Sequence, residues 1–262
     1  MVPTMITRIL ELPEEIKNKY DMSSLTSLGS SSAPLMTRTK EQALDFFKNI
    51  RFSEGYGSTE TGALTTLRHR DQLRKIRSIG QPNPGIEIKL LDEEGNVITE
   101  PGKQGVLWAK ARSAFIGYYK EPEKTRQSID GEWSTPGDIA YFDEEGYYYL
   151  ADRKHDMIIS GGENVYPAEI EEIISSLSQV SEVAVIGVPH DEWGEEVKAV
   201  VVLREGEQIT EQEILDYCKE NLAGYKRPRS VEFVEDFPRT ATGKILKRIL
   251  RKPYWEGQER QI

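Results

Sequence analysis

The sequence lacks the features that mark secreted and membrane-spanning proteins. It has one cysteine, Cys218, so it forms no internal disulfide, which suits a reducing compartment. Its longest apolar runs, such as 183–186 and 199–203, are far too short to cross a bilayer. The first residues have no basic region before an apolar core, as a signal peptide would. These absences predict a cytoplasmic protein without a transmembrane segment, in which Cys218, placed in a helical pattern, is a buried and unreactive thiol.

Positive charge is also scarce. The chain has 34 Lys and Arg against 44 Asp and Glu, a net charge of −10, which argues against nucleic-acid binding and against anionic membranes. The basic residues nevertheless gather late in the chain, at Lys226-Arg227, Arg229, Arg239, Lys244, Lys247-Arg248 and Arg251-Lys252. A solvated helix face accounts for some of them, whereas phosphate binding accounts for their clustering.

The pattern of elements predicts a mixed, α+β chain. With 262 residues, of which 37% are hydrophobic, the length allows one large domain or two moderate ones. The stretch 79–119 reads as strands and turns of a small β-barrel or half-barrel. Later strands alternate with helices, one of which begins with a capping box formed by Thr210 and Glu213. The other elements expected are short helices within 4–20, a strand at 25–28, a helix at 39–50, a hairpin at 139–150, strands at 182–188, 197–203 and 231–234, and a basic helix from 245.

A run of charged residues, Asp152 to Asp156, separates the hairpin from the apolar strand that follows. Exposed charged runs between ordered elements often mark domain boundaries. We therefore expect residues 1–151 to be the latter part of a large α/β N-terminal domain that includes the β-barrel subdomain, 152–156 to be a hinge, and 157–262 to be a compact α+β cap domain.

Two local patterns suggest chemistry. The stretch Ser53 to Gly62 combines glycines, an aromatic ring, hydroxyls and the carboxylate of Glu60. Such a set can place a ring beside a nucleobase, a hydroxyl on a phosphate, and a carboxylate on a metal that bridges phosphates. The small-residue loop around Lys244 can deliver a compact ammonium group to phosphate oxygens. It is not a P-loop, because Pro238 and Ile245 stand where that motif needs Gly and Ser or Thr.

These patterns occur in a recognisable order. Tyr56-Gly57-Ser58-Thr59-Glu60 is followed by Asp138, by Asp152-Arg153, by Ser160-Gly161-Gly162-Glu163-Asn164 and by Thr242-Gly243-Lys244. With these motifs the chain resembles the AMP-forming acyl-CoA synthetases of the adenylate-forming ligase superfamily, over essentially its whole length. The resemblance implies that the reaction uses ATP, Mg²⁺ and coenzyme A, activates a fatty or aromatic carboxylic acid as an acyl-adenylate, transfers the acyl group to CoA and releases AMP.

The resemblance also implies roles for single residues. Around the nucleotide it assigns Tyr56 to adenine, Thr59 to phosphate, Glu60 to Mg²⁺, Asp138 to the ribose hydroxyls, and Gly29, Ser30, Ser31, Gly55 and Gly57 to the adenine-side backbone. In the later part it assigns Arg153 to ribose and phosphate, Asn164 to the AMP phosphate, Gly161 and Gly162 to the pantetheine tunnel, Lys226 with Arg227 to CoA phosphates, and Lys244 to catalysis. The cap domain of the family rotates between the two steps, and the expected pivot is His155, where the family commonly has Asp or Lys. A histidine there predicts a pH-sensitive rotation.

One family motif is absent. The Gly/Ser/Thr-rich phosphate loop that ends in Pro-Lys-Gly does not occur in the sequence. We therefore expect a truncated or split synthetase that adenylates weakly or not at all alone, with a complementing N-terminal half or a homo-oligomer as partner. Two other interpretations stay open: an adenylation domain that loads a carrier protein, and a noncatalytic nucleotide-binding fragment.

Overall fold

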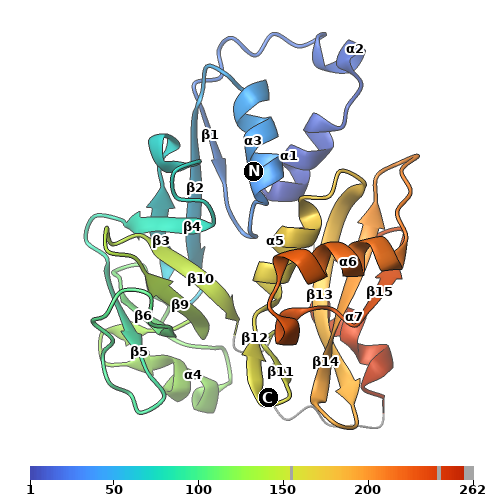
Figure 1. Cartoon of the computed structure of the whole chain (residues 1–262). Coiled ribbons are helices and arrows are strands. Elements are labelled where there is room, and N and C mark those ends of the chain that lie inside the picture. Colours follow the sequence, from blue (N-terminus) through green and yellow to red (C-terminus); the bar gives the residue numbers. More distant parts are fainter. Residues whose placement is uncertain (154–155, 241–242, 257–262) are drawn as a thin grey trace. The chain divides into compact units, whose positions relative to one another are not determined.

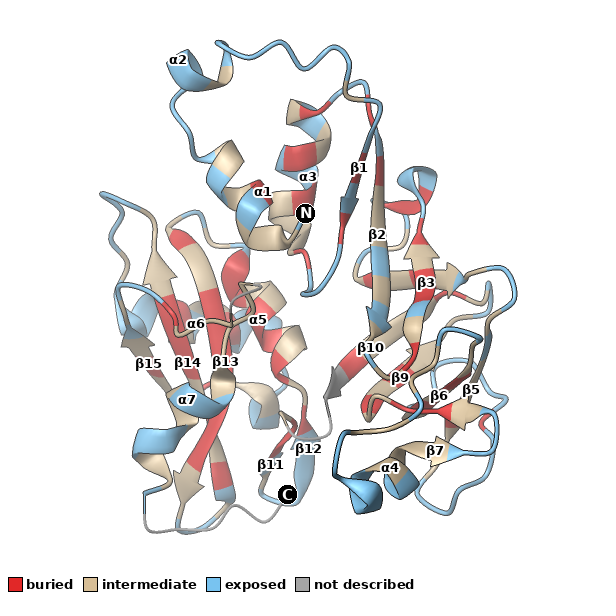
Figure 2. Ribbon diagram, turned by 180° about the vertical axis from the view of Figure 1, so that it is seen from behind, coloured by how far each residue is buried: buried red, intermediate tan, exposed pale blue. Residues whose placement is uncertain are grey.

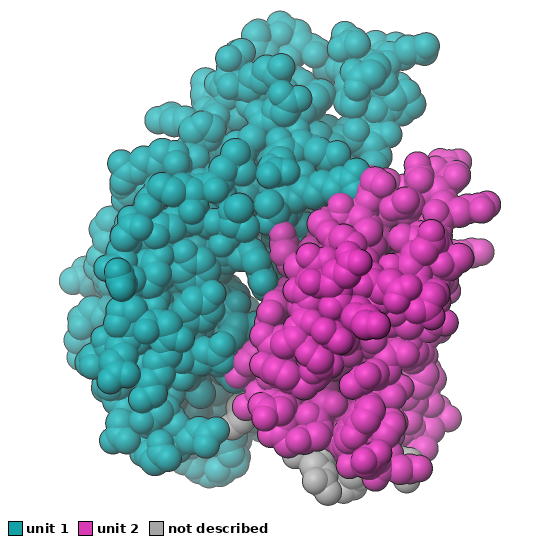
Figure 3. All heavy atoms as spheres, in the orientation of Figure 1, with its two compact units in different colours: residues 1–151 teal, residues 152–262 magenta. Residues whose placement is uncertain are grey.

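A computed structural model describes residues 1–153, 156–240 and 243–256 of the chain. It contains helices, strands and short 3-10 turns, arranged as two compact units, Met1–Ala151 and Asp152–Ile262 (Figures 1 and 3). The predicted mixed α and β fold is confirmed. The predicted hinge at 152–156 stays a prediction, and its residues 154 and 155 lie outside the described part.

The first unit is built on one mixed sheet. Its strands follow the order β1-β2-β3-β4-β10-β9-β6-β8-β7, and β5 pairs with β6. The strands are β1 (Ser27–Ser30), β2 (Arg51–Ser58), β3 (Gly62–Leu67), β4 (Ser78–Pro82), β5 (Glu87–Leu91), β6 (Gly105–Lys110), β7 (Ile129–Asp130), β8 (Trp133–Ser134), β9 (Asp138–Phe142) and β10 (Tyr148–Arg153). The helical elements are α1 (Pro3–Leu10), α2 (Glu14–Lys17), α3 (Thr37–Phe46), the 3-10 turn η1 (His69–Asp71) and α4 (Pro122–Ser128).

Of the small β-barrel or half-barrel expected within 79–119, the closed barrel is wrong. A barrel needs the last strand of a sheet to pair with the first. Among the described residues, the sheet path begins at β1 and ends at β7, and these two strands do not pair. The strands predicted within 79–119 are instead part of this open sheet, because β6 pairs with β9 and β8 as well as with β5.

Two hydrophobic clusters support this sheet. One packs α1 and α3 against β1 and β2, through residues such as Ile6, Ala43 and Phe52. The other lies among the later strands, around Leu64, Leu90 and Leu107. The first strand also differs from expectation, since β1 runs through Gly29 and Ser30, which pair in parallel with Ser53 and Glu54 of β2.

The second unit has a five-stranded sheet in the order β12-β11-β14-β13, and β15 pairs in parallel with β14 along the edge opposite β13. Its strands are β11 (Ile158–Ser160), β12 (Glu163–Val165), β13 (Val180–His190), β14 (Gly194–Leu203) and β15 (Ser230–Phe233). Its helical elements are α5 (Pro167–Ser175), α6 (Glu211–Asn221), η2 (Gly224–Lys226), α7 (Lys247–Arg251) and η3 (Lys252–Tyr254). The capping box predicted at Thr210 and Glu213 is confirmed at the start of α6.

The two long strands of this sheet, β13 and β14, have consecutive buried residues and so are buried on both faces (Figure 2). Successive side chains of a strand point to opposite faces. Accordingly Val183 and Val185 of β13 join one cluster with Ile170 of α5 and Cys218 of α6. The residues at alternate positions of β13 join another cluster: Ala184, Ile186 and Val188. The prediction that Cys218 is buried is confirmed, and burial raises the pKa of its thiol to about 11.

Candidate functional site

The motif Tyr56–Gly62 spans the end of β2 and the tight connection to β3. The two strands are antiparallel, and their register shifts between Tyr56 and Gly57. A Cβ atom at Gly57 would lie 2.1 Å from the carbonyl oxygen of Gly62. Gly57 is therefore required by the close approach of β3, a structural role that the sequence did not reveal. Thr59, at the tip of this connection, is exposed.

Tyr56 and Asp138 lie together. The Tyr56 hydroxyl donates a hydrogen bond of 2.6 Å to Oδ2 of Asp138, across 82 positions of sequence. Asp138 begins β9 and is only 5% exposed. The loop before it is held because the Thr135 hydroxyl donates to the carbonyl of Leu107 and accepts from the amide of Gly137. The structure thus brings two of the residues predicted for the nucleotide into contact.

Glu60 lies next to a residue that the sequence did not single out. The hydroxyl of Tyr118 donates to Oε1 of Glu60 over 2.7 Å, and the amide of Phe115 donates to the Glu60 carbonyl over 3.0 Å. Burial, with the nearby carboxylate of Glu60, raises the pKa of Tyr118. No motif pointed to Tyr118, because its role depends on a contact made 58 positions away.

The carboxylate of Glu60 is a suitable ligand for an Mg²⁺ ion that is bound to the phosphates of a nucleotide. Within residues 1–153, 156–240 and 243–256, no three His, Cys, Asp or Glu side chains gather into a cluster that could hold a metal. Mg²⁺ commonly uses one or two protein carboxylates and takes its other ligands from water and substrate phosphates. Glu60 can supply such a carboxylate, whereas an all-protein metal cage is not present in the described part.

The predicted adenine-side residues at the end of β1 and just after it are only partly accessible. Gly29 and Ser31 are exposed, whereas Ser30 is 2% exposed. The side chain of Ser30 therefore belongs to the packing of the strand. Gly55 of β2 is exposed, and a Cβ there would meet only ordinary contacts.

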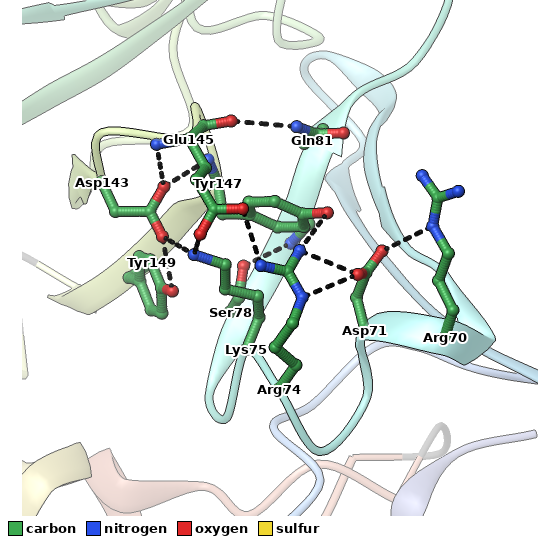
Figure 4. A network of polar contacts seen from close by, with 11 residues as sticks. Arg70, Asp71, Arg74, Lys75, Ser78, Gln81, Asp143, Glu145, Tyr147 and Tyr149 are labelled. Carbon is green, nitrogen blue, oxygen red and sulfur yellow. Dashed lines mark hydrogen bonds and ion pairs between the residues drawn. The ribbon is translucent and has the colours of Figure 1, made fainter.

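A polar network fixes the turn of the hairpin that starts at Asp138 (Figure 4). Asp143 accepts hydrogen bonds from the amides of Glu145 and Tyr147 through Oδ1, and from Lys75 and the Tyr149 hydroxyl through Oδ2. Burial alone would raise the pKa of Asp143, but these donors, Lys75 first, hold it below its ordinary value.

The same network ties the hairpin to η1 and the residues after it. Arg74 donates to Asp71, to Glu145 and to the Tyr147 hydroxyl. Hydrogen bonds to Asp143 and Glu145 raise the pKa of Lys75. The turn after β9 is therefore anchored to the segment between β3 and β4. This also anchors β9, the strand that begins with Asp138.

In the second unit, Gly161 and Gly162 form the turn between β11 and β12. Both have positive φ angles, +61° and +84°, which L side chains rarely adopt. Asn164 lies on β12 opposite Ile159. The two glycines and Asn164 are exposed. The backbone of Arg153 belongs to β10, its side chain is not described, and His155 lies outside the described residues.

Lys226 is engaged by a carboxylate. Its ammonium group donates to both oxygens of Glu169, at 2.9 and 2.7 Å. Burial lowers the pKa of Lys226, but the hydrogen bonds that it donates to Glu169 outweigh this effect, and the net shift is upward. A CoA phosphate bound by Lys226 would have to compete with Glu169.

Lys244 sits at the end of a tight loop that is closed by its own backbone. The amide of Thr240 donates to the Lys244 carbonyl, and the Lys244 amide donates to the Thr240 hydroxyl. Arg239, at the start of the loop, forms an ion pair with Glu182 of β13. The loop is therefore anchored to the sheet, although residues 241 and 242 lie outside the described part.

Comparison with known proteins identifies the family. Residues 1–119 match the family model of the AMP-binding enzymes, and residues 169–244 match the model of the AMP-binding enzyme C-terminal domain. The chain belongs to the AMP-binding enzyme family. Its relatives include acyl-CoA ligases, and its resemblance to this family is confirmed.

Several members of the family can be compared with the chain. The long-chain-fatty-acid–CoA ligase FadD13 of Mycobacterium tuberculosis is 47% identical over 79% of this chain and 41% of the relative. The amide bond synthetase McbA from Marinactinospora thermotolerans superposes with a TM-score of 0.89 at 29% identity, over 97% of this chain and 52% of that chain. The anthranilate CoA ligase AuaEII, solved with anthranoyl-AMP, superposes with a TM-score of 0.87 at 34% identity, over 97% and 49% of the two chains.

This AMP-binding family member spans about half the length of the curated relatives it matches. Across the described residues, none of the helices has the length and apolar character needed to cross a membrane.

Proposed function

We propose that the chain is the latter part of an AMP-forming acyl-CoA synthetase. The observation that carries this proposal is the 2.6 Å hydrogen bond between Tyr56 and Asp138, with Glu60 on the same β2–β3 connection as Tyr56. One part of the first unit would then hold three groups for the nucleotide. These are the ring of Tyr56 for adenine, the carboxylate of Asp138 for ribose and the carboxylate of Glu60 for Mg²⁺.

The proposed reaction has two steps. In the first, a carboxylate oxygen of the acid attacks the α-phosphorus of ATP while the bond to pyrophosphate breaks, which gives an acyl-adenylate. In the second, the sulfur of CoA attacks the acyl carbon and the acyl–oxygen bond breaks. AMP leaves with the bonding electrons, the thiol proton is released, and the acyl group ends as a thioester.

The first unit would bind and orient the nucleotide. Tyr56 would stack on adenine, Asp138 would accept hydrogen bonds from the ribose hydroxyls, and Thr59, exposed at the tip of its connection, would donate to a phosphate. Glu60 would hold Mg²⁺, which when bound neutralises charge on phosphate oxygens. The Tyr56 hydroxyl donates to Oδ2 of Asp138, so the ribose hydroxyls would share the oxygens of Asp138 with the Tyr56 hydroxyl.

The second unit would supply the remaining groups. Lys244 would offset the negative charge that develops at the α-phosphate. Arg153 would reach ribose and phosphate, Asn164 would bind the AMP phosphate in the thioester-forming step, and Gly161 with Gly162 would leave room for the pantetheine arm. Rotation about His155 would separate the two steps. Lys226 would hold a CoA phosphate in place of Glu169.

The proposed acid is a fatty or aromatic one. FadD13 is named for long-chain fatty acids and AuaEII for anthranilate, and both are similar to this chain over most of its length. The similarity to the amide bond synthetase McbA favours one alternative, in which an amine takes the place of CoA as acceptor. Supplying CoA or an amine to the acyl-adenylate in the complete enzyme would distinguish the two.

Binding of AMP, measured by calorimetry, tests the proposal on the 262-residue chain itself. Asp138→Ala is expected to weaken AMP binding about tenfold or more, since hydrogen bonds to a charged group contribute about 1.5–3 kcal/mol. Asp130→Ala, an exposed carboxylate of β7, is the control and should bind AMP as the unmodified chain does. Equal affinities of the two variants, or no AMP binding at all, would refute the assigned nucleotide site.

Acid-dependent exchange of pyrophosphate into ATP tests the first chemical step. We expect little exchange by the 262-residue chain alone, because its sequence contains no phosphate loop for the β- and γ-phosphates. Exchange should appear when a segment with that loop is added. If the chain binds AMP but shows no exchange either alone or with the added segment, the result would favour a noncatalytic nucleotide-binding fragment.

A further inference from the structure

The segment Ser113–Tyr118, called here the clamp loop, holds the connection that carries Glu60. The amide of Phe115 donates to the Glu60 carbonyl over 3.0 Å, and the Ser113 hydroxyl donates to the Thr61 carbonyl over 3.2 Å. The loop approaches so closely that a Cβ atom at Gly62 would lie 2.2 Å from the Ser113 hydroxyl oxygen. The backbone from the Glu60 carbonyl to Gly62, just after the Glu60 side chain, is therefore held by the clamp loop.

Tyr118, at the end of the clamp loop, is itself fixed from two further sides. Its amide donates to the hydroxyl of Thr125 on α4 over 2.9 Å. Its ring packs edge-on against Phe115, with ring centroids 4.9 Å apart and planes at 78°. With its backbone and ring held in this way, the Tyr118 hydroxyl donates to Oε1 of Glu60 over 2.7 Å.

We propose that Tyr118 is a positioning residue that orients the Glu60 carboxylate for the Mg²⁺ of a bound nucleotide. This inference rests on the proposed function. A carboxylate has about four lone-pair sites, so accepting from the Tyr118 hydroxyl at Oε1 is compatible with binding a cation as well. The donor limits rotation of the carboxylate, so a metal would meet a group whose orientation is already restricted. Outer partners of this kind commonly set metal affinity without touching the metal.

The test compares Tyr118→Phe with Tyr119→Phe in the full chain. Tyr119 is the adjacent residue and is 85% exposed, so its hydroxyl serves as the matched control. Calorimetry would measure ATP binding with MgCl₂ and with EDTA, and AMP binding with EDTA. The ratio of the two ATP affinities reports the metal contribution, whereas AMP binding without metal reports the intact nucleotide pocket. Mn²⁺ in place of Mg²⁺ adds a spectroscopic readout, the water-proton relaxation of the Mn²⁺–ATP complex.

We expect Tyr118→Phe to lower the Mg²⁺ enhancement of ATP binding about tenfold and to leave AMP binding unchanged. Tyr119→Phe should change neither. Thr125→Val, which removes the acceptor of the Tyr118 amide, should act in the same direction as Tyr118→Phe and guards against a misfolded single variant.

Three results would overturn the inference. The first is an equal Mg²⁺ enhancement of ATP binding in Tyr118→Phe and Tyr119→Phe, the second is no Mg²⁺ enhancement in the unmodified chain, and the third is a loss of AMP binding in Tyr118→Phe as large as its loss of ATP binding. If the unmodified chain binds AMP but any of these results is obtained, only the role of Tyr118 is refuted. If it does not bind AMP, the proposed function is refuted and this inference with it.

Discussion

At the scale of single residues, Tyr56 combines two roles that substitution can separate. Its ring would stack on adenine, and its hydroxyl donates to Asp138. Stacking of a base on an aromatic side chain contributes about 1–3 kcal/mol when measured by alanine substitution. We therefore expect Tyr56→Ala to weaken AMP binding about tenfold and Tyr56→Phe to weaken it less, as measured by calorimetry. Equal losses in the two variants would contradict a stacking role.

A second prediction at this scale concerns the reactivity of the Cys218 thiol. Burial raises the pKa of its thiol to about 11, and the side chain is 0% exposed. At pH 8 roughly a thousandth of such thiols are ionised, and only the thiolate reacts readily. We expect no modification by a thiol reagent in the native chain, and one equivalent after unfolding in guanidinium chloride. Rapid modification of the native chain would show that this part of α6 is not packed as described.

At the scale of elements, the turn between β9 and β10 depends on Asp143. Its carboxylate accepts from two amides, from Lys75 and from the Tyr149 hydroxyl. Asp143→Ala removes these acceptors and is expected to lower the free energy of unfolding by about 2 kcal/mol. The neighbouring Glu144 is exposed, and Glu144→Ala should change the free energy of unfolding by less than about 0.5 kcal/mol. Urea titration measures both, and equal values would refute the anchoring role.

The contribution of Asp143 to the stability of the folded chain should depend on pH. The pKa of Asp143 is lowered in the folded chain from its ordinary value of 3.8, mainly by Lys75 once burial has been overcome. A carboxyl group with a lowered pKa adds stability above its unfolded pKa, and this stability is lost as the pH falls through the folded value. The difference in melting temperature between the unmodified chain and Asp143→Ala should therefore be constant from pH 5 to 7 and shrink below about pH 4. A difference that grows on acidification would contradict this assignment.

Elements with local signals were predictable from the sequence, whereas their pairing was not. The capping box of Thr210 and Glu213 marked the start of α6 because both halves of the signal lie within one turn. The expectation of a small barrel or half-barrel within 79–119 missed the larger open sheet to which these strands belong, because closure depends on which strands pair, and periodicity carries no information on that. Gly57 and Tyr118 are similar cases, since one is fixed by Gly62 across a hairpin and the other by Glu60 from a distant segment.

At the scale of the whole molecule, each compact unit has hydrophobic clusters of its own. The clusters around Ile6 and Leu64 belong to Met1–Ala151, and those around Ile170 and Ile186 belong to Asp152–Ile262. The family models also match the two regions separately. A unit that buries its own core on both faces of a sheet meets the requirement for independent folding.

We therefore expect a fragment of residues 152–262 to fold alone, with a cooperative thermal transition followed by circular dichroism. Within that fragment, Ile186→Ala should lower the free energy of unfolding by about 3 kcal/mol, because the side chain is 0% exposed and its loss leaves a cavity. Ile249→Ala is the control, since Ile249 is 43% exposed. A fragment without a cooperative transition, or one in which both substitutions cost the same, would show that the second unit depends on the first for its core.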